Sequence, residues 1–218
     1  MKKAIVFGAS GFVGSYLLKA LLDDPDYEQV TIVVRKVINV QHPKLKTVTG
    51  DFHSLPDLAS EINADDVFIT LGTTKKKTPD QKAYREIDHD YPVLAAQLAL
   101  KNGAKSVFLL TAVGSDAGSG VFYIRTKGET ERDILALDFE HTHIFRPSLI
   151  TGDRAEKRIL EKIFIGIWPV VDTMLFGSWK KYKGIHAKDI ALAMKNAAKV
   201  QKHKVKIYEW DDMQRLLH

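Results

Sequence analysis

The chain has 218 residues, of which 45% are hydrophobic and 27% charged, a composition that supports one sizeable hydrophobic core but not two. It contains no cysteine, which excludes disulfide bonds and every redox or metal site that requires a thiolate. Its net charge of +5 is spread along the chain without interleaved aromatic residues, which argues against a nucleic-acid partner.

Strand and helix patterns alternate along the chain as far as Arg146. Buried strands are expected at 4–7, 30–34, 46–49, 67–71, 106–111 and 143–146. Helices are expected at 12–22, at 91–100 with a start near Gln81 and an end at Asn102-Gly103, and at 123–137. Such alternation predicts an α/β fold, with a Rossmann-like, doubly wound, mostly parallel sheet and helices on both of its faces.

The pattern is less regular after Ile150. Helices are expected at 156–165, 188–198 and 211–217, whereas 167–176 is apolar without a clear period. That apolar segment suits a core, a dimer surface or the wall of a substrate pocket. We expect a single domain over 1–218, with a small elaboration on the substrate side from about 151 to 218.

Three glycines separate the first expected strand from the first expected helix, in the stretch Gly8-Ala9-Ser10-Gly11-Phe12-Val13-Gly14. The first glycine allows a tight turn, the second lets a pyrophosphate approach the backbone, and the third lets the helix pack closely on the strand. The pyrophosphate would accept hydrogen bonds from free N–H groups at the helix N-terminus. A glycine-rich turn without a ligand has the same spacing, but strand, turn and helix together favour a dinucleotide. Its expected contacts are Gly8, Ser10, Gly11, Phe12 and Val13.

The end of the second expected strand indicates which dinucleotide is bound. An acidic residue about 20 positions after the glycines would bind the ribose diol of NAD. Arg35 and Lys36 stand there instead. A guanidinium suits the 2′-phosphate of NADP through a bidentate, charge-assisted contact. The alternative is that both side chains are solvated, as basic residues at strand ends often are. We expect NADP (NADPH), with NAD less favoured.

Four landmarks make the sequence similar to the short-chain dehydrogenases/reductases of the atypical or extended kind. They are Gly8-x-x-Gly11-x-x-Gly14, Gly50-Asp51-Phe52, Tyr123-Ile124-Arg125-Thr126-Lys127 and Arg146-Pro147-Ser148-Leu149-Ile150-Thr151-Gly152. A closer resemblance, to the small Tat-interacting-protein subgroup, rests on Leu71-Gly72-Thr73-Thr74-Lys75, Asp88-His89-Asp90-Tyr91, Phe122-Tyr123, Lys127-Gly128-Glu129 and Phe145-Arg146-Pro147. This similarity covers most of the chain and weakens after about residue 165.

The resemblance implies further contacts with the cofactor. Asp51 and Phe52 would flank the adenine, and Leu71, Gly72 and Thr73 would lie beside the nucleotide. The segment Pro147, Ser148, Leu149 and Ile150 would lie against the nicotinamide. The alternatives are that Asp51 is a turn residue and that Pro147 only ends a strand.

Tyr123 and Lys127 are the expected catalytic pair. Their i, i+4 spacing places both side chains on one face of a helix. A tyrosine becomes a useful acid or base when a nearby ammonium stabilises its phenolate. In the family the tyrosine exchanges a proton with the substrate oxygen, while the lysine lowers the tyrosine pKa and holds the nicotinamide ribose. An ordinary surface helix pair has the same spacing.

The family also places a serine or threonine after the fifth strand to bind the reacting carbonyl. The stretch here is Leu110-Thr111-Ala112-Val113-Gly114-Ser115. Relatives often carry two adjacent serines, which match Thr111 and Ala112. Thr111 is the expected carbonyl-binding residue, with Ser115 as the alternative.

No metal site is expected. Asp88-His89-Asp90 is interpreted as a solvated helix start, because adjacent residues do not converge on one helix face. His141 and His143 are interpreted as packing or surface residues of a strand. His186 is expected at a junction between loop and helix.

Three functions are compatible with these features. The first is an NADP-dependent oxidoreductase acting on a small carbonyl or alcohol substrate. The second is an NADPH-binding sensor that controls contacts with a protein partner or within a homodimer. The third is a sugar-nucleotide epimerase or dehydratase, which the chain length and the Arg35-Lys36 pair disfavour.

The N-terminus does not have the features of a signal peptide, because the apolar run after Met1-Lys2-Lys3 stops at Gly8. No stretch approaches the ~18 apolar residues of a membrane span. We therefore expect a cytoplasmic protein without a membrane span.

Overall fold

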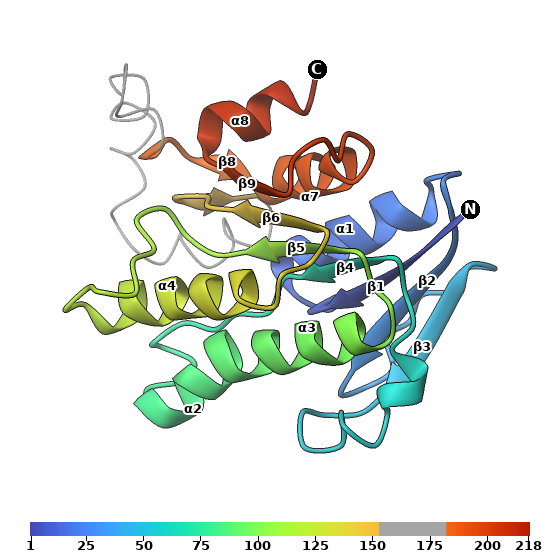
Figure 1. Cartoon of the computed structure of the whole chain (residues 1–218), viewed down its shortest axis with the longest axis horizontal. Coiled ribbons are helices and arrows are strands. Elements are labelled where there is room, and N and C mark those ends of the chain that lie inside the picture. Colours follow the sequence, from blue (N-terminus) through green and yellow to red (C-terminus); the bar gives the residue numbers. More distant parts are fainter. Residues whose placement is uncertain (153–181) are drawn as a thin grey trace.

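Parallel strands form the main sheet of the protein. The computed structural model of the chain describes residues 1–152 and 182–218. The strands of the main sheet are β1 (Lys2–Phe7), β2 (Tyr27–Val34), β3 (Leu45–Thr49), β4 (Asp66–Ile69), β5 (Ser106–Leu110), β6 (His141–Phe145) and β9 (Val205–Tyr208). Among the described residues they pair in the order β3-β2-β1-β4-β5-β6-β9, all in parallel (Figure 1). The order reverses between β1 and β4, which confirms the doubly wound, Rossmann-like fold.

Helices cover both faces of the sheet, as predicted. α1 (Phe12–Leu22), α7 (Ala187–Ala197) and α8 (Trp210–Arg215) lie on one face, and α3 (Tyr91–Lys101) and α4 (Phe122–Leu135) lie on the other (Figure 1). Successive residues of a strand point to opposite faces, so Ala4 and Val6 of β1 pack in the core layer of α1 and α7. Ile5 and Phe7 pack in the layer of α3 and α4.

The segment before α3 is not the continuous helix that the sequence predicts. It consists of a short helix α2 (Gln81–Arg85), a π-helical turn η2 (Glu86–Asp90) and then α3. Pro92 has no N–H to donate to the carbonyl of Asp88, four residues earlier. That carbonyl instead accepts a hydrogen bond from Thr130 Oγ1 on α4, at 2.8 Å. The missing donor and its replacement give a physical reason for the wider turn at this point.

The described part of the C-terminal region contributes to the main sheet. β9 was not predicted from the sequence, because Lys206 separates Val205 from Ile207 and Lys204 precedes them in a lysine-rich stretch. α7 and α8 confirm the helices expected at 188–198 and 211–217. A separate two-stranded sheet joins β7 (Ile150–Thr151) to β8 (Ile185–His186), and a 3₁₀ turn η1 (Ala59–Glu61) precedes β4.

Two expectations for the C-terminal region lie outside the described residues, namely the helix at 156–165 and the apolar segment at 167–176. The division into one domain with an elaboration from about 151 stays a prediction.

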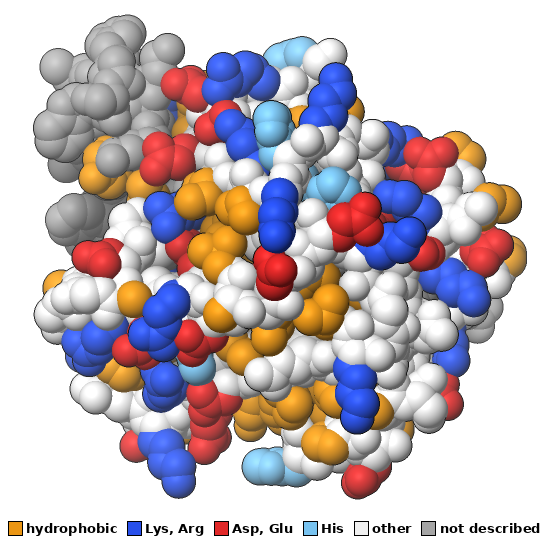
Figure 2. Space-filling view, in the orientation of Figure 1, with side chains coloured by type: hydrophobic (Ala, Val, Ile, Leu, Met, Phe, Trp, Pro, Cys, Tyr) orange, Lys and Arg blue, Asp and Glu red, His pale blue; other side chains and the backbone are white. Residues whose placement is uncertain are grey.

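Charged side chains of both signs are mixed on the surface. Figure 2 shows Lys and Arg side chains interspersed with Asp and Glu over the visible face. Within 1–152 and 182–218, no helix has the length and apolar character needed to cross a membrane. The same ranges contain no group of three or more His, Asp or Glu side chains placed to hold a metal ion. The mixed charge is typical of a solvated surface.

Candidate functional site

The carboxyl ends of the parallel strands bring most of the predicted site residues to one edge of the sheet. Gly8 follows β1, Arg35 follows β2, Leu71 lies just after β4, Thr111 follows β5 and Pro147 lies just after β6. In open α/β sheets a ligand binds at this edge, in the crevice where the strand order reverses. That reversal lies between β1 and β4, beside the glycine turn.

The glycine turn has the close backbone contacts that its spacing predicts. Gly8 has a φ of +93°, and its carbonyl accepts a hydrogen bond from the Gly11 N–H at 2.8 Å. A Cβ on Gly8 would lie 2.8 Å from the carbonyl carbon of Thr70, and a Cβ on Gly14 would collide with the Gly8 carbonyl. Gly11 is the N-cap of α1, and no side chain caps this helix end. The turn therefore fits a pyrophosphate that would accept hydrogen bonds from backbone N–H groups.

Ser10, Phe12 and Val13 occupy the same turn. Ser10 is exposed at its outer side, whereas Val13 is buried in the core layer of α1. The backbone of Val13 and not its side chain is thus the group that faces the expected pyrophosphate. Phe12 is half-buried, with its ring centroid 6.4 Å from that of Tyr16 one turn along α1.

The expected adenine side has two exposed cations. Arg35 and Lys36 both follow β2 directly and are exposed. Burial raises the pKa of the Tyr91 phenol, and the positive charge of the Arg35 guanidinium offsets part of that rise. Arg35 therefore lies on the same side of the edge as Tyr91, the first residue of α3.

Asp51 and Phe52, also expected beside the adenine, make different kinds of contact with the protein. The Asp51 carboxylate accepts the backbone N–H groups of His53 and Ser54, each at 3.0 Å, and the Ser54 N–H is the main cause that lowers its pKa. Asp51 is thus a turn residue, the alternative left open by the sequence. The Phe52 ring is stacked on Tyr91 with 3.2 Å between the ring centroids. One ring face of Phe52 is covered by the protein.

Residues 147–150, which are expected beside the nicotinamide, form hydrogen bonds with the loop after β5 and with residues 183–185. The Pro147 carbonyl accepts the Val113 N–H at 2.9 Å, in the loop after β5. The Ser148 hydroxyl donates to the Lys183 carbonyl at 2.6 Å. The Leu149 carbonyl accepts the Ile185 N–H at 2.9 Å, where Ile150 pairs with Ile185 between β7 and β8.

Tyr123 and Lys127 lie on α4, as predicted. Tyr123 is 42% exposed, whereas Lys127 is 6% exposed and its Nζ lies 2.7 Å from Asp88 Oδ1. Burial raises the pKa of the Tyr123 phenol, and the Asp88 carboxylate raises it further. The expectation that Lys127 lowers this pKa stays a prediction; in this structure the Lys127 ammonium is paired with the Asp88 carboxylate.

Asp88 is a candidate site residue that was not predicted from the sequence. Its side chain is 1% exposed, and its Oδ2 accepts the Thr73 N–H at 2.7 Å. A Cβ on Gly72 would lie 3.6 Å from both Asp88 Oδ1 and Lys127 Nζ, so the loop after β4 passes directly over this ion pair. Of the three residues expected beside the nucleotide, Thr73 thus binds Asp88 and Gly72 lies next to the Asp88–Lys127 pair.

The interpretation of Asp88-His89-Asp90 as a solvated helix start is wrong. His89 is also buried, and its ring nitrogens lie 2.6 Å from Asp90 Oδ1 and 2.8 Å from Asp133 Oδ2 on α4. The π-helical turn places Asp88 and His89 against neighbouring elements. Pro92, four residues after Asp88, is the signal that the sequence offered for an irregular turn.

A second phenol lies beside the same carboxylate. Tyr84 on α2 is buried, and its hydroxyl donates to the Thr73 carbonyl at 3.4 Å. Burial raises its pKa, followed by the charges of Asp88 and Tyr123. Two tyrosines and one lysine therefore surround Asp88.

Thr111 and Ser115 are both buried and both donate to protein acceptors. The Thr111 hydroxyl donates to Glu131 Oε1 at 2.6 Å, and the Ser115 hydroxyl donates to the Ala112 carbonyl at 2.7 Å. A residue that binds a reacting carbonyl must donate its proton to the substrate. In this conformation neither hydroxyl proton is directed to a substrate, so the structure gives the proposed role of Thr111 no support.

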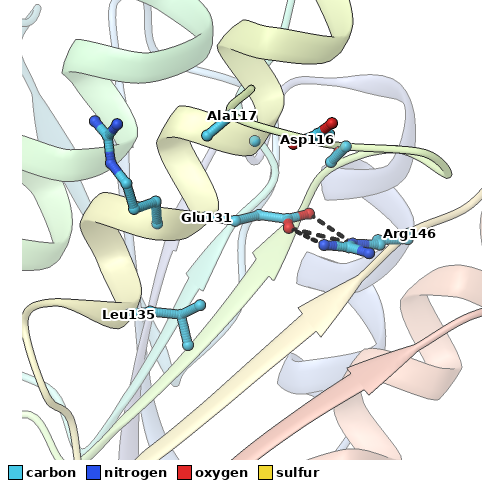
Figure 3. A pocket seen from close by; sticks show the side chains of 8 residues that line it. Asp116, Ala117, Glu131, Leu135 and Arg146 are labelled. Atoms are coloured by element: carbon cyan, nitrogen blue, oxygen red, sulfur yellow. Dashed lines mark hydrogen bonds and ion pairs between the residues drawn. The ribbon is translucent and has the colours of Figure 1, made fainter. Parts of the chain in front are cut away.

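A hollow of about 340 Å³ lies between α4 and the loop after β5 (Figure 3). At its inner side Glu131 of α4 forms an ion pair with Arg146, which stands at the end of β6. Glu131 is 4% exposed, and its hydrogen bond raises the pKa of Arg146. Tyr123 and Lys127 do not line this hollow. The Glu131–Arg146 ion pair, together with the Thr111 hydrogen bond to Glu131, holds α4 to the ends of β6 and β5.

Sequence comparison gives matches over most of the chain. A family model described as NAD(P)H-binding matches residues 8–164. A Candida albicans protein named "Protein FMP52, mitochondrial" is 30% identical over 223 residues, covering 97% of this chain and 96% of the relative. A Rattus norvegicus protein named "Protein HTATIP2" is 33% identical over 161 residues, covering 72% of this chain and 66% of the relative.

Solved structures of the extended epimerase and dehydratase kind have the same fold. The Bordetella bronchiseptica enzyme WbmH in complex with NAD⁺ matches with a TM-score of 0.68 and 18% identity, over 96% of this chain and 76% of that chain. The Helicobacter pylori ADP-L-glycero-D-manno-heptose-6-epimerase matches with a TM-score of 0.69 and 15% identity, over 99% of this chain and 80% of that chain.

The fungal relatives correct one expectation. Those from Candida albicans, Candida glabrata and Meyerozyma guilliermondii are all named as mitochondrial proteins. The prediction of a cytoplasmic location is wrong by this finding.

Proposed function

Because the chain belongs to the NAD(P)H-binding family and is an atypical protein of the short-chain dehydrogenase/reductase type, we propose that it is an oxidoreductase acting on a small carbonyl or alcohol. The observation that carries this proposal is the position of α4. Lys127 Nζ lies 3.6 Å from the position that a Cβ on Gly72 would occupy, in the loop after β4, and Tyr123 precedes Lys127 by one helical turn. An acid/base group thus stands beside the expected cofactor crevice.

The residues of the edge have separable tasks in this proposal. A bound nicotinamide dinucleotide supplies the hydride chemistry. Gly8, Gly11 and the start of α1 bind its pyrophosphate, and Lys127 orients the nearby ribose. Tyr123 Oη exchanges a proton with the substrate oxygen, while Pro147 to Ile150 exclude water from one side. A Cβ on Gly8 or Gly14 would collide with Thr70 or with the Gly8 carbonyl, so this tight turn, the kind that binds a pyrophosphate, needs glycine at both positions.

NADP is the proposed dinucleotide. Arg35 and Lys36 are exposed at the end of β2, where a 2′-phosphate would lie, and neither makes a described ion pair with a carboxylate. A guanidinium free to form two parallel hydrogen bonds favours a phosphate over a diol.

Replacement of Tyr123 tests the oxidoreductase function. Tyr123→Phe removes the proton donor and should reduce carbonyl-dependent NADPH oxidation by about 10²- to 10⁴-fold, with NADPH affinity nearly unchanged. Turnover is measured over a panel of aldehydes and ketones, and affinity by calorimetry. Tyr27→Phe is the control, because it removes a phenol at the opposite edge of the sheet, where its hydroxyl donates to Asp66. Equal turnover in Tyr123→Phe and the unsubstituted protein contradicts the proposal.

A second candidate function is an NADPH-binding sensor without catalysis. The observation in its favour is that both Thr111 and Ser115 donate their protons within the protein. A negative result over the whole carbonyl panel, together with tight NADPH binding, would select the sensor. The epimerase or dehydratase alternative rests on likeness of fold alone.

A further inference from the structure

The buried carboxylate of Asp88 joins α4 to the loop after β4. Oδ1 pairs with Lys127 Nζ on α4, and Oδ2 accepts the Thr73 N–H in the loop after β4, each at 2.7 Å. Asp88 is 1% exposed and Lys127 6% exposed, so water does not screen their interaction as it would at the surface. One side chain therefore determines both the position of the Lys127 ammonium and the net charge around it.

The charged and titratable groups that face this pair come from each neighbouring element. α2 contributes the Tyr84 phenol, α4 contributes Lys127 and the Tyr123 phenol, and η2 contributes Asp88 itself. Lys127 and Asp88 together carry no net charge. A phenol loses its proton easily only beside an uncompensated cation. Here burial and the Asp88 carboxylate both raise the pKa of Tyr123, and the pKa of Tyr84 is raised in the same way.

We propose that Asp88 is a positioning residue that neutralises Lys127 and keeps Tyr123 protonated near neutral pH, so that Tyr123 can donate its proton to the oxygen of a carbonyl substrate. This inference rests on the proposed oxidoreductase function and specifies its substrate class as an aldehyde or ketone. In the reaction the carbonyl carbon accepts a hydride from a reduced nicotinamide dinucleotide, and the carbonyl oxygen accepts the Tyr123 proton. The carbonyl is reduced to an alcohol and the nicotinamide is oxidised.

The π-helical turn holds Asp88 independently of its carboxylate. Thr130 Oγ1 donates to the Asp88 backbone carbonyl at 2.8 Å, and His89 and Arg85 bind Asp133 and Glu129 of α4. In Asp88→Asn these contacts remain, and the amide oxygen can still accept the Thr73 N–H. The substitution therefore removes the negative charge with little change to the backbone around it.

Titration of the phenols in the cofactor-free protein tests the inference. Tyrosinate absorbance is followed against pH for the unsubstituted protein, for Asp88→Asn and for Asp90→Asn. Each is also measured with Tyr123→Phe added, and the difference between the two titration curves reports Tyr123 alone. Asp88→Asn should shift the Tyr123 titration to lower pH, because Lys127 is then uncompensated. Asp90→Asn is the matched control, since it removes a half-exposed carboxylate of the same turn that binds His89 and Arg85 but not Lys127. A shift no larger than the control's overturns the inference.

The unsubstituted protein gives a second test that does not depend on how a variant folds. Its Tyr123 titration should lie above the ordinary tyrosine pKa of about 10. A midpoint below that value would show that Lys127 dominates, and would overturn the role of Asp88. With a substrate from the carbonyl panel, the pH above which carbonyl reduction slows should also be lower in Asp88→Asn, because Tyr123 loses its proton earlier; an unmoved pH profile contradicts the inference.

Failure of the proposed function gives a different result. If Tyr123→Phe keeps full turnover, the oxidoreductase assignment fails, whereas the phenol titration still reports what Asp88 does to Tyr123. If Tyr123→Phe loses turnover and the titration is insensitive to Asp88, only the inference about Asp88 fails.

Discussion

Arg35 is the residue whose charge most directly separates the two nicotinamide dinucleotides. Arg35→Ala should weaken NADPH binding by about 10- to 100-fold, because a charge-assisted pair of hydrogen bonds contributes about 1.5–3 kcal/mol. NADH binding should change little, because its ribose carries no phosphate. Calorimetric Kd values for the two dinucleotides measure the difference.

Lys19→Ala is a suitable control for Arg35→Ala. It removes one exposed positive charge from α1, in its last turn and so away from the glycine turn. If Arg35→Ala weakened both dinucleotides equally, or no more than Lys19→Ala did, Arg35 would not bind a 2′-phosphate.

Asp88 shows how one residue can be misassigned from sequence at this scale. Asp, His and Asp in succession are polar and adjacent, which is typical of a solvated helix start. The burial of Asp88 and His89 depends on Pro92 further along the chain and on Lys127, Thr130 and Asp133 of another helix. Those partners are close only in the folded protein, so no local pattern of the sequence contains them.

At the scale of the element, α4 depends on a close approach to the loop before it. A Cβ on Gly128 would collide with the backbone nitrogen of Ala117 and the backbone carbonyl carbon of Asp116. Helix propensity favours alanine over glycine by about 1 kcal/mol, but a clash with backbone atoms costs about 1–3 kcal/mol or more. Gly128→Ala should therefore lower the free energy of unfolding, measured by urea denaturation.

Gly118→Ala is the matched control in the same loop. The nearest atom to its added Cβ is Asp116 Oδ1 at 3.5 Å, an ordinary contact, so its stability should change little. If Gly128→Ala instead raised the free energy of unfolding by about 1 kcal/mol, helix propensity alone would govern this position.

At the scale of the whole molecule, His143 makes stability depend on pH. It lies in β6 with its ring centroid 4.7 Å from that of Phe108, and Nδ1 lies 2.9 Å from the Tyr208 hydroxyl. Burial, followed by the charges of His141, His203 and Lys2, lowers its pKa from 6.5 to about 4. The native state therefore binds fewer protons than the unfolded state between these two values.

The free energy of unfolding should accordingly fall as the pH falls through that window, because the unfolded state gains the proton first. The loss from His143 begins near pH 6.5 and is complete near pH 4, and amounts to about 3 kcal/mol. Chemical denaturation at pH 7 and at pH 4 measures it. His143→Phe should reduce this pH dependence, whereas His53→Gln, at an exposed site, should leave it intact. An unchanged slope in His143→Phe contradicts the assignment.

The order of strands and helices was largely predictable because each element has a local pattern. β1, β2, β4 and β5 are short runs of apolar residues, and α1 and α3 have apolar residues at helical spacing. β9 was not predictable in this way. Its short, lysine-containing segment becomes a strand because β6 offers it a free edge.

The glycine turn, the α/β fold and the position of Tyr123 and Lys127 on one helix follow from residues a few positions apart, so they could be predicted from the sequence. The charges that meet at the site could not be predicted in this way and depend on how the elements pack. The tertiary structure paired Lys127 with Asp88, and it directed the Thr111 hydroxyl to Glu131. The physical reason is that electrostatic interactions depend on distance and burial in space, and the chain brings these partners together only when its elements pack.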